Sequence, residues 1–316
     1  MTSPTEHRAG FVAIIGRPNV GKSTLLNRYV GEHLAIVSAK PQTTRNRIMG
    51  VVTRPEFQVA FLDTPGIHQA KGALNRFMVD VALGAMGEVD AVLFLVEAAV
   101  TREGKAEIGE GNRFILERLG RARKPVVLGI NKIDLFPDKR LLLPIIDAYR
   151  GQFPFAEVFP LSASKTQGTE QLLQHLAKLM PESPALFPED VITDQAERQL
   201  VAEYVREQVL KNLRQEIPYS TAVVVEEFDE SERGEGGTRT KPKGLVRIDA
   251  LIFVERDSQK AIVIGKGGAM LKKIGTEARK RIEAFLGSRV FLQLTVRVEP
   301  NWSDSARSLS KLGYTR

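Results

Sequence analysis

The chain carries a phosphate-binding motif, G-x-x-x-x-G-K-[ST], directly after an apolar run and directly before a helix-forming stretch. Its members are Gly16, Arg17, Pro18, Asn19, Val20, Gly21, Lys22 and Ser23. Backbone N–H groups of such a turn form an anion site, to which the following helix adds the positive end of its dipole. Lys22 can reach the β- and γ-phosphates of a nucleotide, and the Ser23 hydroxyl can ligate a bridging Mg²⁺. The motif therefore predicts polyphosphate as the ligand, with a plain glycine-rich turn as the alternative.

A second motif, D-x-x-G, follows the apolar run at residues 59–62 and consists of Asp63, Thr64, Pro65 and Gly66. A carboxylate at the end of a strand can hold Mg²⁺ through water, and the free N–H of the glycine can donate to a γ-phosphate. Pro-Gly also favours an ordinary type II turn. The phosphate-binding motif upstream favours the functional interpretation.

The polar segment between these motifs, residues 38–45, contains a proline and is typical of a loop. Either Thr43 or Thr44 could complete the Mg²⁺ shell and sense the γ-phosphate. The residue chemistry leaves both open, and it also leaves open that both are ordinary surface threonines.

A third motif, N-K-x-D, follows the apolar run at residues 126–130 as Asn131, Lys132, Ile133 and Asp134. Guanine presents its N1–H and an exocyclic amino group side by side, and one carboxylate can accept from both. Adenine lacks this pair of donors, so the carboxylate would be left desolvated and unpaired. Asp134 therefore predicts guanine recognition, while the Lys132 stem can lie along the base and Asn131 can brace the phosphate loop.

A shorter signal, Ser162-Ala163-Ser164, follows the apolar run at residues 158–161. The Ala163 N–H could donate to the guanine O6, and a serine-rich turn before a helix at 169–179 is a compatible account. Together with the other motifs, this predicts GTP or GDP with Mg²⁺ as the bound cofactors.

Length, charge and cysteine content bound the class of protein. At 316 residues the chain is long enough for two domains. The net charge of +7 suits an anionic partner, such as nucleic acid or a membrane surface, and does not choose between them. The absence of cysteine excludes a disulfide framework, and no window approaches the ~20 apolar residues of a spanning helix. We expect a soluble, cytoplasmic protein.

Apolar runs at 11–15, 59–62, 91–96, 126–130 and 158–161 alternate with helical stretches. This alternation predicts an α/β domain with a mostly parallel, doubly wound sheet, and the motifs above stand at the carboxyl ends of its strands, where ligands bind. We assign residues 1–10 to an N-terminal tail and 11–180 to this domain. The proline-rich segment 181–192 is the predicted linker.

The remainder, residues 193–316, predicts a smaller α+β domain. A helix at about 195–213, capped by Thr193 or Asp194, precedes strands at 222–225, 245–254 and 290–298. Between the first two strands, the polar, glycine-rich residues 230–239 predict a hairpin excursion.

A G-x-x-G turn, Gly265-Lys266-Gly267-Gly268, stands between an apolar segment and a helix whose apolar stripe is Ile274, Ala278, Ile282 and Phe285. This pattern is typical of the KH module, in which side-chain-free glycines let a single-stranded nucleic acid backbone lie against the turn. Basic residues gather here and include Lys266, Lys272, Lys273, Arg279, Lys280, Arg281 and Arg289. A solvated helix face is the alternative, but the order of elements favours RNA binding through phosphate contacts.

The four nucleotide motifs resemble those of the translation-factor-like GTPases over about the first 180 residues. Ile67 stands where other members carry a water-orienting glutamine, so the chain is similar to the hydrophobic-substituted subgroup. In potassium-dependent members an asparagine at the place of Asn19 helps to bind K⁺. The resemblance selects Thr44 over Thr43 as the Mg²⁺ ligand, which implies Ser23, Thr44 and Asp63 as metal ligands and Lys22, Thr44, Gly66 and Asn19 as catalytic residues.

Over essentially the whole chain, the order of a P-loop GTPase domain and a type II KH domain resembles the Era family; the glycine-rich stretch near 230–243 departs from its compact pattern. The resemblance implies binding near the 3′ end of 16S rRNA and a role in maturing the 30S ribosomal subunit. It also implies peripheral association with the inner membrane, and we expect a monomer. Gly265, Lys266, Gly267, Gly268, Lys272 and Lys273 are the expected RNA-binding residues.

Three other functions fit the sequence less well. A small-molecule kinase would not need Asn131 and Asp134. An RNA-binding module with a vestigial nucleotide site would bind RNA identically with and without GTP. A tRNA-modification GTPase would need a further cofactor domain, for which no residues remain. A slow, GTP-controlled RNA-binding switch is the hypothesis that the sequence supports best.

Overall fold

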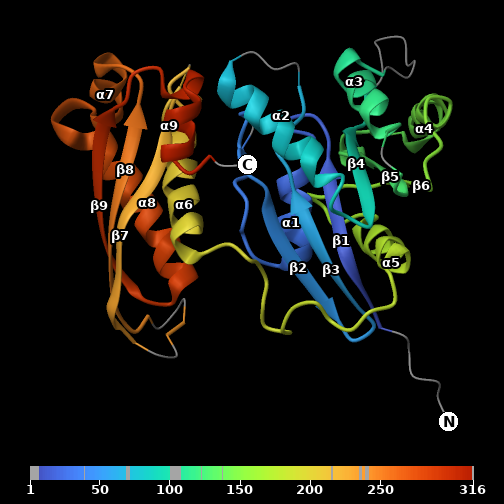
Figure 1. Cartoon of the computed structure of the whole chain (residues 1–316), viewed down its shortest axis with the longest axis horizontal. Helices are drawn as coiled ribbons and strands as arrows, with labels where there is room; N and C mark the ends of the chain where they lie inside the picture. Colours follow the sequence, from blue (N-terminus) through green and yellow to red (C-terminus); the bar gives the residue numbers. More distant parts are fainter. Residues whose placement is uncertain are drawn as a thin grey trace. The chain divides into compact units, whose positions relative to one another are not determined.

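The computed structural model describes residues 7–38, 40–68, 72–99, 108–121, 123–136, 138–214, 216–234, 237–238 and 242–314. Most of the expected N-terminal tail and part of the expected excursion at 230–239 lie outside these residues. The chain divides into two compact units, which meet in sequence between Asp194 and Gln195 (Figure 1). Along the described residues no helix has the length and apolar character needed to cross a bilayer.

The first unit is built on a six-stranded sheet in the order β2-β3-β1-β4-β5-β6. Its strands are β1 (Arg8–Ile15), β2 (Ile48–Arg54), β3 (Phe57–Asp63), β4 (Ala91–Glu97), β5 (Val126–Asn131) and β6 (Glu157–Pro160). All neighbours pair in parallel except β2, which is antiparallel to β3. The mostly parallel α/β sheet is confirmed, although the sequence pattern missed β2. Gly50 interrupts that strand's apolar pattern, and a Cβ there would lie 2.6 Å from Leu26 of the helix packed on it.

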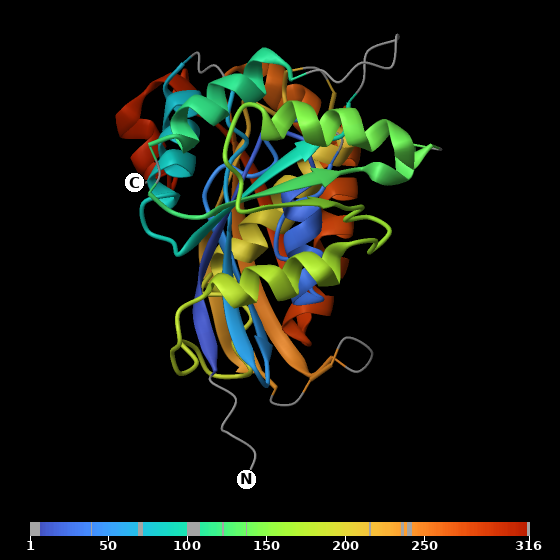
Figure 2. The same cartoon turned by 90° about the vertical axis from the view of Figure 1, so that its right-hand side faces the viewer.

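Helices cover both faces of this sheet, as expected of a doubly wound fold (Figures 1 and 2). One face packs α2 (Ala73–Ala85), α3 (Glu110–Leu119) and α4 (Leu142–Arg150) into a core with Phe94 and Leu128. The other carries α1 (Lys22–Val30) and α5 (Thr169–Leu179), where Tyr29 stacks on Phe61 with 5.0 Å between ring centroids. Short turns η1 (Ile133–Leu135) and η2 (Lys139–Leu141) follow β5.

The segment predicted as the linker is hydrogen-bonded to the edge of the first unit's sheet. The buried side chain of Gln58 accepts from the N–H groups of Leu186 and Phe187 at 2.7 and 2.9 Å. Further along, the Val51 N–H donates to the Ile192 carbonyl at 2.9 Å. Residues 186–192 therefore follow β2 and β3, the two strands that connect the loop of Thr44 with Asp63.

The second unit has a three-stranded sheet in the order β7-β8-β9, covered by α6 and α8. Its elements are α6 (Glu197–Asn212), β7 (Ala222–Arg233), β8 (Gly244–Val254), α7 (Asp257–Ile264), η3 (Lys266–Gly268), α8 (Ala269–Leu286), β9 (Arg289–Val298), η4 (Trp302–Asp304) and α9 (Ala306–Lys311). Strands β7 and β8 are antiparallel, and β8 and β9 are parallel. This is the α-β-β-α-α-β order expected of a type II KH domain.

One local expectation for this unit is wrong. The helix α6 begins after Ala196 without a side-chain cap, and the hydroxyl of Thr193 donates to the Met49 carbonyl at 2.7 Å instead. The antiparallel strands β7 and β8 form a hairpin, and residues 230–233 of the expected excursion belong to its first strand, since Glu232 pairs with Leu245 and Arg233 with Gly244. Their polarity reflects an exposed edge strand, whose side chains are solvated on both faces.

Candidate functional site

The phosphate loop joins β1 to α1 and holds the Lys22 side chain against itself. Lys22 is buried, and its Nζ donates to the carbonyls of Gly16 and Arg17 at 3.3 and 3.0 Å. Burial lowers the pKa of Lys22 to about 8, against the opposing effect of the Asp63 carboxylate. The buried ammonium of Lys22 therefore lies next to an anion site, where the negative charge of a phosphate would stabilise it.

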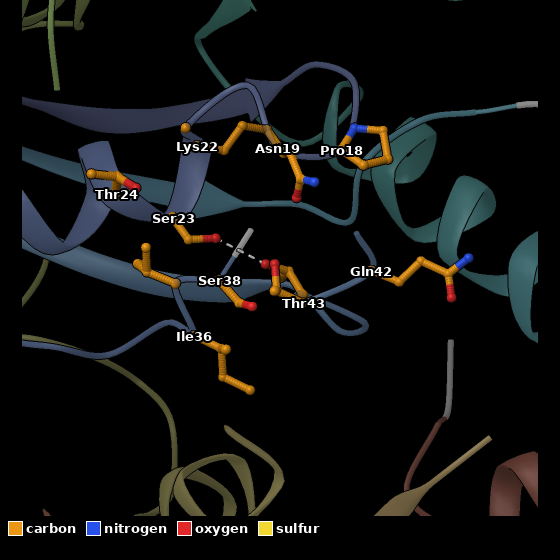
Figure 3. A pocket seen from close by; sticks show the side chains of 13 residues that line it. Pro18, Asn19, Lys22, Ser23, Thr24, Ile36, Ser38, Gln42 and Thr43 are labelled. Atoms are coloured by element: carbon orange, nitrogen blue, oxygen red, sulfur yellow. Dashed lines mark hydrogen bonds between the residues drawn. The ribbon is translucent and has the colours of Figure 1, made fainter. Parts of the chain in front are cut away.

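Three oxygen-bearing side chains converge beside this lysine. The hydroxyls of Ser23 and Thr44 donate to Oδ2 of Asp63 at 2.7 and 3.2 Å, and they lie 3.0 Å from each other. Figure 3 shows Ser23 with one of these contacts drawn as a dashed line. Burial raises the pKa of Asp63, while Lys22 and the two hydroxyls oppose that rise.

This cluster fits a hard divalent cation. The other carboxylate oxygen of Asp63, Oδ1, is buried and has no hydrogen-bond partner among the described residues. An unpaired buried carboxylate oxygen next to two hydroxyls is an all-oxygen set of ligands, which suits a Mg²⁺ that keeps several waters.

The loop between α1 and β2 brings Thr44, and not Thr43, to the cluster. Thr44 is buried against Ser23 and Asp63, whereas Thr43 is only half-buried, although both line the same cavity. Sequence reasoning did not name several other lining residues as site residues; these are Thr24, Ile36, Val37, and Ser38 and Gln42 of the loop at 38–45. Figure 3 labels all of them except Val37.

The second motif is fitted closely to the phosphate loop. A Cβ on Gly66 would lie 2.5 Å from the backbone nitrogen of Pro18, and the Ile67 N–H donates to the Gly16 carbonyl at 3.0 Å. Ile67 is fully buried in the core and Thr64 donates to the Ile14 carbonyl at 2.9 Å. No side chain at position 67 therefore reaches the cavity to orient water.

The outer part of the phosphate loop sends its side chains in different directions. Pro18 and Asn19 line the cavity, and Asn19 has a left-handed backbone with φ of 64°. The Arg17 side chain instead lies beside α3, where a Cβ on Gly111 would be 2.8 Å from its Nε. Val20 is buried. Of Arg17 and Val20, only the backbone is placed to take part in phosphate binding.

The N-K-x-D motif is tied to the phosphate loop by Asn131. Its Nδ2 donates to the Val20 carbonyl at 2.7 Å, so the predicted brace is confirmed. Its Oδ1 accepts from the Ala163 N–H at 2.9 Å. That N–H, which we expected to be free for the guanine O6, is therefore engaged within the protein.

The remaining base-recognition residues lie outside the cavity of Figure 3. Asp134 is exposed on η1, while Ser162 is buried in the turn after β6. Lys132 pairs with Glu97 at the end of β4, with 2.8 Å between Nζ and Oε2. Sequence reasoning missed Glu97, whose only signal was its place at the end of a strand.

The G-x-x-G turn of the second unit is open. Gly265, Gly267 and Gly268 have positive φ angles of 73°, 59° and 80°, and no atom lies within 4 Å of a Cβ built on Gly267 or Gly268. Lys266 and, on α8, Lys272 and Lys273 are exposed, and the described residues form no ion pair with them. The turn offers bare backbone and unneutralised positive charge, which suits a phosphodiester strand.

Two family models match the chain. One, described as a 50S ribosome-binding GTPase, matches residues 11–132, and the other, described as a KH domain, matches residues 216–303. Together with the fold and the site, these matches define a GTPase with a P-loop domain followed by a KH domain.

Similar proteins share this whole arrangement. A GTPase Era of Geobacter metallireducens is 51% identical over 313 residues, which cover 99% of this chain and 100% of that protein. One of Lacticaseibacillus paracasei is 48% identical, with 98% of each chain covered. The chain belongs to the Era family of GTPases.

Solved structures of this family superpose on the full chain. An Era crystal structure in complex with MgGDPNP and nucleotides 1506–1542 of 16S ribosomal RNA has a TM-score of 0.89 and 38% identity, covering 98% of this chain and 100% of that one. A variant of Aquifex aeolicus Era bound to GDP·AlF4− gives a TM-score of 0.88 at 38% identity, with the same coverage.

Proposed function

We propose that this GTPase is a switch that binds the 3′ end of 16S rRNA and assists maturation of the 30S ribosomal subunit. The observation that carries the proposal is the presence, in one chain, of a closed polar cluster at Ser23, Thr44 and Asp63 and an open, basic G-x-x-G turn. The Era complex with 16S rRNA nucleotides and MgGDPNP supports the same pairing of ligands.

In the first unit, Lys22 and the N–H of Gly66 would bind the γ-phosphate. Ser23, Thr44 and Asp63 would hold Mg²⁺, which neutralises charge on the β- and γ-phosphates when bound. Lys22 would leave the Gly16 carbonyl for phosphate. Asp134 and Lys132 would bind guanine, and Asn131 would keep them in register with the phosphate loop.

Hydrolysis would be slow in the isolated protein, because Ile67 is buried and offers no water-orienting group. Positioning and electrostatics then supply most of the catalysis. Asn19, at the cavity, is placed to bind K⁺ beside the transferring phosphate, which would add a positive charge. Equal turnover in K⁺ and Na⁺ would remove Asn19 from this role.

In the second unit, Gly265, Gly267 and Gly268 would lie against the RNA backbone, and Lys266, Lys272 and Lys273 would contact phosphates. We further propose a cytoplasmic monomer with peripheral contact to the inner membrane, for which the net charge of +7 is the only support within the chain.

The test is binding of an RNA with the sequence of 16S nucleotides 1506–1542, measured with the protein in GDPNP and in GDP. We expect tighter binding in one nucleotide state. The double variant Lys266→Asp with Gly267→Asp should lose RNA binding at least about 30-fold through charge repulsion, while its GTP hydrolysis without RNA stays that of the wild type. Equal RNA affinity in both nucleotide states would contradict the switch, and preference for ATP over GTP would favour the kinase alternative.

A further inference from the structure

The loop that carries Thr44 is anchored to a helix outside the cavity. Gln42, two residues before Thr44, has a left-handed backbone with φ of 60°. Residues other than glycine adopt this conformation only at a cost in free energy. Its side chain reaches away from Ser23 (Figure 3), and its Nε2 donates to Oδ1 of Asn75 in the first turn of α2 at 3.0 Å. The hydrogen bond from the Gln42 side chain to Asn75 therefore stabilises an unfavourable backbone conformation of Gln42.

The loop that carries Gly66 reaches the same atom. One ring nitrogen of His68, Nε2, lies 3.2 Å from Oδ1 of Asn75, and the other, Nδ1, lies 2.9 Å from the Gly66 carbonyl oxygen. The next N–H, of Ile67, donates to the Gly16 carbonyl of the phosphate loop. The peptide group between Gly66 and Ile67 is therefore held at both ends, and His68 connects it to α2.

The side-chain amide of Asn75 on α2 is consequently in contact with residues of both loops, Gln42 and His68. The orientations of the Gln42 and Asn75 amides and the tautomer of His68 together decide which atoms donate in these contacts. The two loops lie at the same end of the antiparallel β2–β3 pair, where Ile48 at the start of β2 pairs with Asp63 at the end of β3. Without Asn75, no hydrogen bond described in the structure links Gln42 to His68.

We propose that Asn75 is a positioning residue for GTP hydrolysis, which orders the loops of Thr44 and Gly66 relative to each other. This inference rests on the proposed function, in which Thr44 meets Mg²⁺ and the Gly66 N–H meets the γ-phosphate. Donors and ligands aimed at the transferring phosphate act best when they are ordered before the reaction. A shared anchor on a helix restricts both loops at once and fixes their positions relative to each other.

The test separates hydrogen bonding from packing at position 75. Asn75→Leu has a similar size but no polar atom, and Asn75→Asp keeps an acceptor oxygen in the place of Oδ1. We expect kcat of Asn75→Leu to fall about 10-fold, as for the loss of one to two neutral hydrogen bonds, with GDP affinity changed less than about 2-fold. Asn75→Asp should retain most of the wild-type kcat. Gln171→Leu, an amide-to-leucine change at an exposed position of α5, is the matched control and should leave both values unchanged.

A double-mutant cycle tests the shared anchor directly. Gln42→Ala and His68→Ala should each lower kcat several-fold in the wild-type background and have little further effect in Asn75→Leu. Additive losses, an unchanged kcat in Asn75→Leu, or equal losses in Asn75→Leu and Asn75→Asp would each overturn the proposal. These outcomes leave the proposed function standing, because its own failure appears in the wild type as RNA binding that ignores the nucleotide.

Discussion

The two ligand-binding loops of this chain use glycine for opposite purposes. In the first unit, a Cβ on Gly66 would lie 2.5 Å from the backbone of Pro18, and one on Gly21 would lie 2.2 Å from the Asn131 side chain. In the second unit, a Cβ on Gly267 or Gly268 would meet nothing within 4 Å. Gly21 and Gly66 let protein fit against protein, and so does Gly265, where a Cβ would lie 2.7 Å from that of Met270. Gly267 and Gly268 instead keep space for a ligand.

The charged groups follow the same division. Lys22 and Asp63 are buried and form hydrogen bonds within the first unit. Lys266, Lys272 and Lys273 are exposed to solvent. The difference indicates that substitutions in the first site alter the packing of the protein itself, whereas substitutions in the second alter only the binding of RNA.

The largest expected effect is on base recognition. Asp134→Asn replaces a carboxylate that accepts two guanine hydrogens with an amide that faces one of them with a donor. GTP affinity should fall by about 10⁴-fold, as in sites built around a specific hydrogen-bond pattern, and xanthine nucleotides should become the preferred ligands. Titration with fluorescent guanine and xanthine nucleotides measures this.

The exposed Asp147→Asn on α4 is the matched control for that change. If Asp134→Asn kept its preference for GTP, the assignment of this carboxylate would be wrong. RNA binding by the nucleotide-free Asp134→Asn protein should equal that of the wild type, because we propose that the nucleotide binds in the first unit and RNA in the second.

Gly66→Ala tests the closed site by steric means. The added methyl group collides with the backbone at Pro18, which must move the Gly66 N–H from the γ-phosphate. Loss of one such donor costs about 10²–10³-fold in kcat. Single-turnover GTP hydrolysis measures it, and GDP affinity should change little, since GDP has no γ-phosphate. A kcat within a few-fold of the wild type would show that the loop tolerates a Cβ and would weaken the contrast between the two glycine-rich loops.

A third prediction concerns the buried Lys22. Its pKa is about 8 in the folded protein and 10.5 in a model peptide, so between these pH values the unfolded chain holds a proton that the folded chain has lost. The free energy of unfolding of the nucleotide-free first unit should therefore rise with pH across this window, by up to about 3 kcal/mol. Below pH 8 both states are protonated, and the penalty for burying the charge is fully present.

Other groups also titrate in this range, so the comparison is with Lys22→Met. Denaturation followed by circular dichroism at pH 8 and pH 10 should give a smaller rise in the variant. Fluorescence of Trp302, the only tryptophan and fully buried in the second unit, serves as an internal control. An identical pH response in wild type and variant would contradict the shifted pKa.

The sequence predicted the residues of the binding sites better than the contacts that hold those residues in place. Motif residues such as Lys22 and Asp134 carry their chemistry in their type and spacing, and the brace by Asn131 follows from its motif. Gln42, Asn75 and Glu97 could not be found, because each acts through a partner far away in sequence. Residue chemistry alone did not decide between Thr43 and Thr44; the family resemblance selected Thr44, and the structure places its hydroxyl against Asp63.

Local pattern also failed where tertiary contacts decided the outcome. Thr193 has the side chain of a helix cap, but the Met49 carbonyl captures its hydroxyl. Ala163 carries the expected N–H, but Asn131 accepts from it. In both cases the group was identified correctly and its partner was not, since hydrogen-bond partners depend on the fold and not on the neighbouring sequence.

The smallest expected effect comes from Gly267→Ala, the counterpart of Gly66→Ala in the open loop. Because no atom lies within 4 Å of the new methyl group, the protein should accept it with only the strain of a side chain at φ of 59°, about 1 kcal/mol. GTP hydrolysis should not change. RNA affinity should fall about 3- to 10-fold, because the methyl group occupies the space in which the ribose-phosphate backbone lies. Titration with the 16S fragment, together with Trp302 fluorescence during unfolding, separates the two effects. A loss of stability larger than that of Gly66→Ala would mean that this turn, too, is fitted to its own protein and not held open for RNA.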